Sequence, residues 1–178
     1  MLVGLFIAFI MVFSIFGFVI DYAVQPGSAK YGAFKFKVVN ERYVTKINGN
    51  EYRFLFFPRD LEYINVSDDV KQLFSKHTLI VTYDSNSELA ENFGEAQYYF
   101  ETQLNGVKVI ERALTGEGTL PKKSCADATA EQPVIELRKG EESSISAENN
   151  CIIVSVLDAY SIYQQTERLV YSGLGVMS

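Results

Sequence analysis

The chain opens with an uninterrupted apolar segment. Residues 1–20 contain 17 apolar side chains and no charged one, and the first charge is Asp21. At about 1.5 Å per residue, a helix of this length spans a hydrocarbon core of about 30 Å. The segment therefore predicts a single transmembrane signal-anchor helix, followed by a linker at residues 21–32 and a folded domain at residues 33–178.

Two alternatives for the same segment stay open, a cleaved signal peptide and a buried hydrophobic helix. A signal peptide has a basic start, a shorter apolar core and small residues at a cleavage site close behind it. No Lys or Arg precedes this run, and its best pair of small residues, Gly27 and Ala29, lies well beyond Ile20. The pattern favours an uncleaved anchor.

Alternation with a period of two begins the domain. In residues 34–38, phenylalanine and valine alternate with lysine, which predicts a strand with one buried face. Asn48-Gly49 then separates the apolar runs 43–47 and 52–57, and Asn-Gly favours a tight hairpin turn. Pro58 cannot donate to a sheet ladder. The segment is therefore predicted to be an antiparallel meander that ends at this proline.

The middle of the chain predicts a strand–helix–strand unit. Ser67 is suited to cap a helix of about three turns, and residues 79–83 follow as a strand. A second helix is predicted over residues 88–104, and Ser85 and Glu88 have the spacing of a capping box at its start. A strand is predicted to follow at residues 107–114. This order is typical of a crossover between parallel strands.

The last third begins as a loop at residues 115–132. Short apolar strands are predicted at 134–137 and 151–156, with residues 140–150 as a long hairpin connection. Asp158 is suited to cap a final helix, whose apolar face is Ile162, Thr166, Leu169, Val170 and Leu174. In sum, the pattern predicts one α+β domain with a mixed sheet, about seven strands and three helices.

The balance of charged residues and a few individual side chains argue against several classes of binding or catalytic site. The chain has 16 Lys plus Arg against 22 Asp plus Glu, and the two signs are interleaved, so no clustered positive face is expected, which argues against nucleic-acid binding. The only histidine, His77, follows the first predicted helix and is interpreted as a helix terminus. Residues 84–88 resemble the start of a calcium loop but have Leu89 where that loop requires glycine. No metal or other cofactor is expected.

The two cysteines, Cys125 and Cys151, lie 26 positions apart. This spacing is too long for a redox Cys-x-x-C, and the ligands of a zinc site are missing. In an exported domain the pair predicts a structural disulfide, and the alternative is two thiols with Cys151 buried. The lysines that follow the apolar segment would by themselves keep the domain in the cytoplasm, but the cysteine pair favours export.

Tyrosine is the least ordinary part of the composition, with 11 residues. Tyr98, Tyr99, Tyr160 and Tyr163 are predicted on helix surfaces, where tyrosine supplies rigid amphipathic contact area for a protein partner. The alternative interpretation places them at the edges of the core.

Four short segments of the last third of the chain share a pattern with other proteins: 125–129 (Cys-Ala-Asp-Ala-Thr), 133–135 (Pro-Val-Ile), 151–154 (Cys-Ile-Ile-Val) and 174–177 (Leu-Gly-Val-Met). In these segments the chain resembles small membrane-anchored proteins of uncultivated archaea. It implies only an anchored surface domain with a paired-cysteine loop, because the family has no known activity to transfer.

The sequence therefore favours a non-enzymatic domain, tethered to the membrane through residues 1–20 and located outside the cytoplasm. It would bind a protein partner or take part in cell-envelope assembly. The alternative hypothesis is an enzyme with a carboxylate-based site near Asp84, because this residue ends a predicted strand, where the sites of α/β proteins gather.

Overall fold

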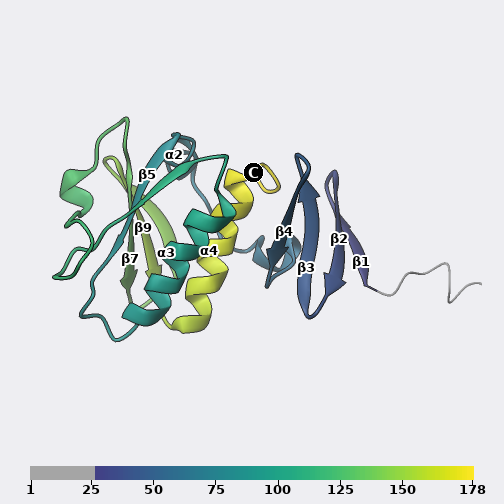
Figure 1. Cartoon of the computed structure of the whole chain (residues 1–178), viewed down its shortest axis with the longest axis horizontal. Helices are drawn as coiled ribbons and strands as arrows, with labels where there is room; N and C mark the ends of the chain where they lie inside the picture. The colour runs from purple at the N-terminus through teal and green to yellow at the C-terminus, as the bar shows by residue number, and fades with distance from the viewer. Residues whose placement is uncertain (1–26) are drawn as a thin grey trace, which may run out of the picture.

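The computed structural model describes residues 27–178, which form an α+β structure with nine strands in two sheets and three α-helices (Figure 1). The predicted class and helix number are confirmed for this part of the chain. The prediction of one mixed sheet with about seven strands is wrong, because the N-terminal meander forms a sheet of its own.

The first sheet is antiparallel and has the order β1-β2-β3-β4. Its strands are β1 (Ser28–Tyr31), β2 (Phe34–Val39), β3 (Arg42–Ile47) and β4 (Asn50–Phe54). The predicted turn is confirmed, since Asn48 and Gly49 join β3 to β4 with φ angles of 50° and 86°. β1 lies within the predicted linker 21–32. Three of its four residues are exposed, so it has no apolar alternation that the sequence could reveal.

The second sheet has the order β6-β5-β7-β9-β8. Its strands are β5 (Thr78–Tyr83), β6 (Val109–Arg112), β7 (Val134–Lys139), β8 (Ser144–Glu148) and β9 (Cys151–Val156). The predicted crossover is confirmed, because β5 and β6 pair in parallel on either side of helix α3 (Ala90–Gln103). The predicted hairpin connection at 140–150 is wrong. That segment contains β8, which pairs antiparallel with β9, while β7 and β9 are parallel.

Alternate positions of the second sheet face two different layers. Leu79, Val81, Ile135, Ile152 and Val154 belong to the main core, together with the apolar side chains of α3 and α4 (Ala159–Gly173). The residues between them form a smaller cluster on the opposite face, made of Ile80, Ala113, Val134, Cys151 and Ile153. Helices therefore cover one face, and part of the loop 115–132 packs on the other through Cys125 and Ala128.

The other predicted helices are present with shifted limits. Helix α2 (Asp68–Phe74) is capped by Ser67 as predicted but has about two turns rather than three. The predicted capping box of Ser85 and Glu88 is not formed, and α3 begins at Ala90. Asp158 caps α4 as predicted: its Oδ1 accepts a hydrogen bond of 2.8 Å from Ser161 N–H, and the predicted apolar face is buried.

Helix α4 connects the two sheets. Its inner face packs on the second sheet, while the Tyr171 ring stacks on Phe54 of β4 with centroids 4.0 Å apart. Two short 3-10 helices complete the chain, η1 (Pro58–Leu61) after β4 and η2 (Cys125–Asp127) in the long loop. Figure 1 shows α3 and α4 between the two sheets, with β1 at the end of the molecule. One hydrophobic core thus joins all three layers.

The predicted membrane anchor, residues 1–20, and the first part of the linker lie outside the described residues. Among the helices of residues 27–178, none combines the length and the apolar character needed to cross a bilayer.

Candidate functional site

Neither His77 nor Asp84 lies in a site of convergent chemistry. His77 is exposed just after α2. Asp84 is also exposed, and its Oδ1 accepts hydrogen bonds from the backbone N–H and the side-chain amide of Asn86. Beside it, Ser85 donates to the carbonyl of Glu117 at 2.7 Å. The Asp84 carboxylate therefore stabilises the turn between β5 and α3.

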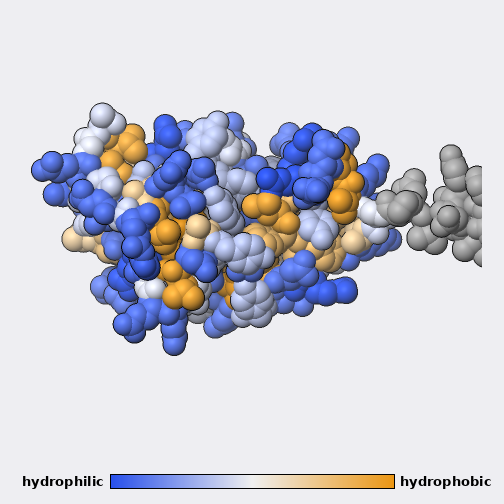
Figure 2. All heavy atoms as spheres, turned by 90° about the horizontal axis from the view of Figure 1, so that it is seen from below, coloured by the Kyte–Doolittle hydropathy of each residue, from blue (hydrophilic) through white to orange (hydrophobic). Residues whose placement is uncertain are grey.

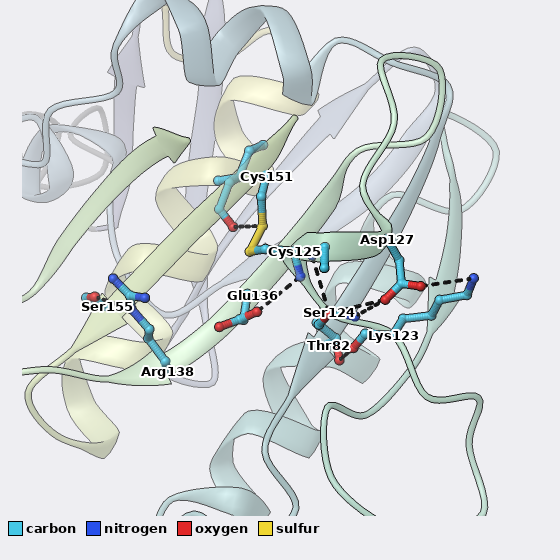
Figure 3. The surroundings of a disulfide bond; sticks show 11 residues. Thr82, Lys123, Ser124, Cys125, Asp127, Glu136, Arg138, Cys151 and Ser155 are labelled. Atoms are coloured by element: carbon cyan, nitrogen blue, oxygen red, sulfur yellow. Dashed lines mark hydrogen bonds and ion pairs between the residues drawn. A yellow bond between two sulfur atoms is a disulfide. The ribbon is translucent and has the colours of Figure 1, made fainter. Parts of the chain in front are cut away.

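Cys125 and Cys151 form the predicted disulfide, with Cα atoms 5.3 Å apart (Figure 3). The bond joins η2 to the first residue of β9 and holds the loop against the helix-free face of the second sheet. Glu136 of β7 accepts a hydrogen bond of 3.3 Å from the backbone N–H of Cys125. Ser124 and Asp127 cap η2 reciprocally, so the loop has a fixed conformation at the bond.

The strongest candidate for a binding site is a groove of about 460 Å³ between β4 and helices α3 and α4. Three of the four tyrosines predicted to contact a partner line it, namely Tyr98, Tyr99 and Tyr163. Tyr160 lies apart from the groove, 60% exposed, with its ring edge-to-face against Phe56 at 5.4 Å. Figure 2 shows pale-blue and orange residues intermixed where the helices meet the four-stranded sheet.

Glu167 of α4 lies at the base of this groove and is only 2% exposed. Its Oε1 accepts hydrogen bonds from Leu55 N–H at 2.7 Å and from the Tyr99 hydroxyl at 3.1 Å, and its Oε2 accepts one from Phe56 N–H at 2.9 Å. These two amides follow β4 directly, which explains why the strand ends at Phe54 and not at Pro58 as predicted. The Glu167 carboxylate of α4 thus accepts the backbone hydrogen bonds that a neighbouring strand would accept in a longer sheet ladder.

Burial dominates the electrostatics of this carboxylate. It raises the pKa of Glu167 from 4.5 to about 7, against the opposing effect of the hydrogen bonds from Leu55 and Phe56. The pKa of Tyr99 is raised well above its usual value, first by burial and then by the negative charge of Glu167. Glu167 and Tyr99 therefore both lose their protons at a higher pH than exposed groups of the same kind.

The sequence did not single out Glu167. It lies in the polar run 164–168, which resembles a solvated helix face, yet residues 165–168 are all buried. The reason is that α4 lies between two sheets and has no fully solvated side at this point. A helix covered on two sides cannot be recognised from an apolar stripe alone.

The rim of the groove is basic. Arg42 and Arg53 line it from the first sheet, and both are exposed. Arg53 forms a surface ion pair with Glu51 at 3.0 Å, whereas within residues 27–178 Arg42 forms no ion pair. The other carboxylate of the groove, Glu95, accepts a hydrogen bond from the Tyr163 hydroxyl, which raises the pKa of that tyrosine.

The groove combines engaged carboxylates with accessible aromatic surface. Both carboxylates of the groove are engaged in internal hydrogen bonds, while aromatic surface and one unpaired guanidinium are left for a ligand. Within residues 27–178, no three acidic, histidine or cysteine side chains are grouped to hold a metal ion. No family model, curated protein or solved structure matches the chain.

Proposed function

We propose that the protein is a membrane-tethered, extracytoplasmic domain that binds a protein partner of the cell envelope through the tyrosine-lined groove. The observation that carries this proposal is the convergence of Tyr98, Tyr99 and Tyr163 from two helices on one cavity. Tyrosine offers a large contact area at a low cost in side-chain entropy, and it is enriched in protein interfaces.

The charges of the groove favour a partner segment that carries a carboxylate beside apolar side chains. Arg42 presents a planar guanidinium that is suited to a bidentate pair with a carboxylate. The groove lining has two guanidiniums, Arg42 and Arg53, against one exposed carboxylate, Glu95, because the carboxylate of Glu167 is buried. An acidic segment with an aromatic or aliphatic anchor matches both features.

The location outside the cytoplasm is supported by the disulfide between Cys125 and Cys151, because such bonds persist in oxidising compartments. Tethering is supported by the uncharged apolar run at residues 1–20. The groove would then face other proteins of the same envelope.

An enzyme remains the alternative, but its best-placed carboxylate would now be Glu167 rather than Asp84. A perturbed carboxyl pKa in a cavity is typical of active sites. Glu167, however, uses both oxygens to hold the backbone at residues 55 and 56. A structural role therefore accounts for its burial, and binding remains the better supported function.

The experiment is site-specific photo-crosslinking of the full chain in its native membrane. A benzophenone amino acid replaces Tyr98, which is 59% exposed in the groove, or Tyr63, a control that is 67% exposed and outside the groove lining. We expect a discrete adduct from position 98, formed through an acidic segment of the partner and lost when Arg42→Glu is added. The same adduct from both positions, or an adduct from position 98 that is insensitive to Arg42→Glu, would contradict the proposal.

A further inference from the structure

The first sheet has one strongly basic face. All six Lys and Arg residues of β1 to β4 lie on its outer side and are exposed: Lys30, Lys35, Lys37, Arg42, Lys46 and Arg53. The side chains between them, such as Phe36 and Phe54, point into the core. The only carboxylate of these four strands is Glu51. This set of six residues is called the basic face below.

Strand register creates the basic face. Lys30 lies directly opposite Lys35, and Lys46 lies opposite Glu51. Directly paired side chains share one side of a sheet, and like charges in such a pair destabilise it. The pairing of Lys30 with Lys35 therefore opposes folding of the sheet. An anion bound outside the domain would relieve this repulsion.

The charge of the protein is strongly asymmetric. The basic face contains six of the 16 basic residues and borders two of the 22 acidic residues, Glu51 in β4 and Glu41 in the turn before Arg42. Since the whole chain has a net charge of −6, the remainder is acidic by about ten charges. Such a dipolar distribution orients a domain on an anionic surface, because the basic side is attracted and the acidic side is repelled.

The basic face lies where the chain comes from its apolar N-terminal segment. Gly27 is the first described residue, and its carbonyl accepts a hydrogen bond of 2.7 Å from Val38 N–H, so the chain joins the domain at this sheet. Figure 1 shows the sheet at the end of the molecule, with β1 outermost. Figure 2 shows deep-blue residues at the end of the molecule that contains the first sheet.

From this juxtaposition we propose that the basic face docks on the anionic phosphate headgroups of the membrane that holds the anchor. This inference rests on the tethering part of the proposed function. Only six residues separate Ile20 from Gly27, and an extended chain of that length reaches about 20 Å at most. The sheet is therefore held within reach of the headgroups, where each basic side chain adds about a fivefold gain in binding.

Docking would also fix the direction of the tyrosine-lined groove. Arg42 and Arg53 belong both to the basic face and to the rim of the groove. With the sheet on the headgroups, the groove opens beside the bilayer, and the acidic remainder of the domain points away from it. A partner would then be bound near the membrane surface.

The test uses the full chain, reconstituted in nanodiscs of phosphatidylcholine with or without one-third phosphatidylglycerol. Lysines are acetylated by a succinimidyl ester, and the rate at each is measured by mass spectrometry. We expect labelling at Lys35, Lys37 and Lys46 to slow at least about fivefold in the anionic nanodiscs. Lys122 in the loop 115–132 and Lys139 at the end of β7, both exposed, should be unaffected. Salt at about 1 M should abolish the protection, because the Debye length falls to about 3 Å.

Matched charge variants complete the test, with Lys30 as the remaining reporter. Lys35→Gln, Lys37→Gln and Lys46→Gln together should weaken docking about 100-fold and remove the protection of Lys30. The control set Lys122→Gln, Arg138→Gln and Lys139→Gln changes the net charge equally and should leave that protection intact.

Three outcomes would overturn the inference. Equal labelling in both nanodiscs, with the chain stably inserted, refutes docking but leaves the anchor. Failure of the chain to insert refutes the anchor and docking together. Protection that requires added polyphosphate, whatever the lipid, would assign the basic face to a soluble polyanion instead of the membrane.

Discussion

Raising the pH through neutrality should weaken the attachment of β4 to α4, because Glu167 titrates there. The perturbation needs no mutation, only a change from about pH 5 to about pH 8. Burial raises the pKa of this carboxyl from 4.5 to about 7 in the folded protein. In the unfolded chain it has its ordinary value, so between these two values the folded state binds a proton that the unfolded state does not.

The sign and size follow from this difference. Stability decreases with pH wherever the folded state binds more protons than the unfolded state. The contribution of Glu167 is therefore fully present below about pH 4.5 and is lost as the pH rises through 7. At about 1.4 kcal/mol per pH unit, the span from 4.5 to about 7 corresponds to about 3 kcal/mol.

The assay is urea denaturation of the full chain in a non-ionic detergent across this pH range, compared with Glu167→Gln. The difference in free energy of unfolding between wild type and Glu167→Gln isolates the one titration, since all other groups are shared. As the pH rises through this range, we expect the free energy of unfolding of the wild type to fall by about 3 kcal/mol relative to that of Glu167→Gln. Glu95→Gln, a carboxylate in the same groove but exposed, serves as the control.

A difference that does not vary with pH would refute this account. A difference that favours the wild type as the pH rises would show that the three hydrogen bonds to Glu167 outweigh burial and keep the carboxylate ionised. Either result would also weaken the assignment of Glu167 as a neutral-pH group in the groove.

Three further predictions concern other parts of the chain. Replacing Cys125 and Cys151 by serine should lower the free energy of unfolding by about 3.5 kcal/mol in the chain-entropy treatment of a 26-residue loop, measured by denaturation, while reductant should no longer affect the double variant. Tyr99→Phe removes the hydroxyl that donates to Glu167, so it should cost about 1 kcal/mol and move the pH midpoint of the Glu167 titration upwards in the same assay. Alkaline extraction of native membranes should leave the full-length chain in the pellet with Met1 near its N-terminus, and a mature start near Lys30 would instead indicate cleavage of the apolar segment.

Local signals in the sequence were enough for the parts of the fold that depend on near neighbours. Asn48-Gly49 supplies the two positive φ angles of its hairpin, and Asp158 supplies the cap of α4 through its own side chain. The strand at 151–156 is buried at every position, so its sequence is apolar except for Ser155. In each case the residues that determine the structure lie within a few positions of it.

The missed features depend on partners distant in the sequence. β1 and β8 are edge strands with few buried residues, so neither has a clear apolar pattern. Glu167 resembles a surface residue until the segment after β4, more than a hundred positions earlier, is packed against it. The basic face cannot be recognised in the sequence for the same reason. Its lysines and arginines are interleaved with apolar residues, and only register gathers them.

Glu167 links the groove to the joint between the two sheets. The positive charge of Arg42 favours its ionised form, although by less than burial opposes it. An acidic ligand paired with Arg42 would weaken the attraction between Arg42 and ionised Glu167. The negative charge of the ligand would also disfavour ionisation of Glu167. Both effects raise the pKa of Glu167 further, so the ligand would bind with uptake of a proton near neutral pH. Because linkage is reciprocal, protonation of Glu167 must then tighten the ligand by the same factor. The carboxylate that holds β4 against α4 would therefore also make the affinity of the groove depend on pH.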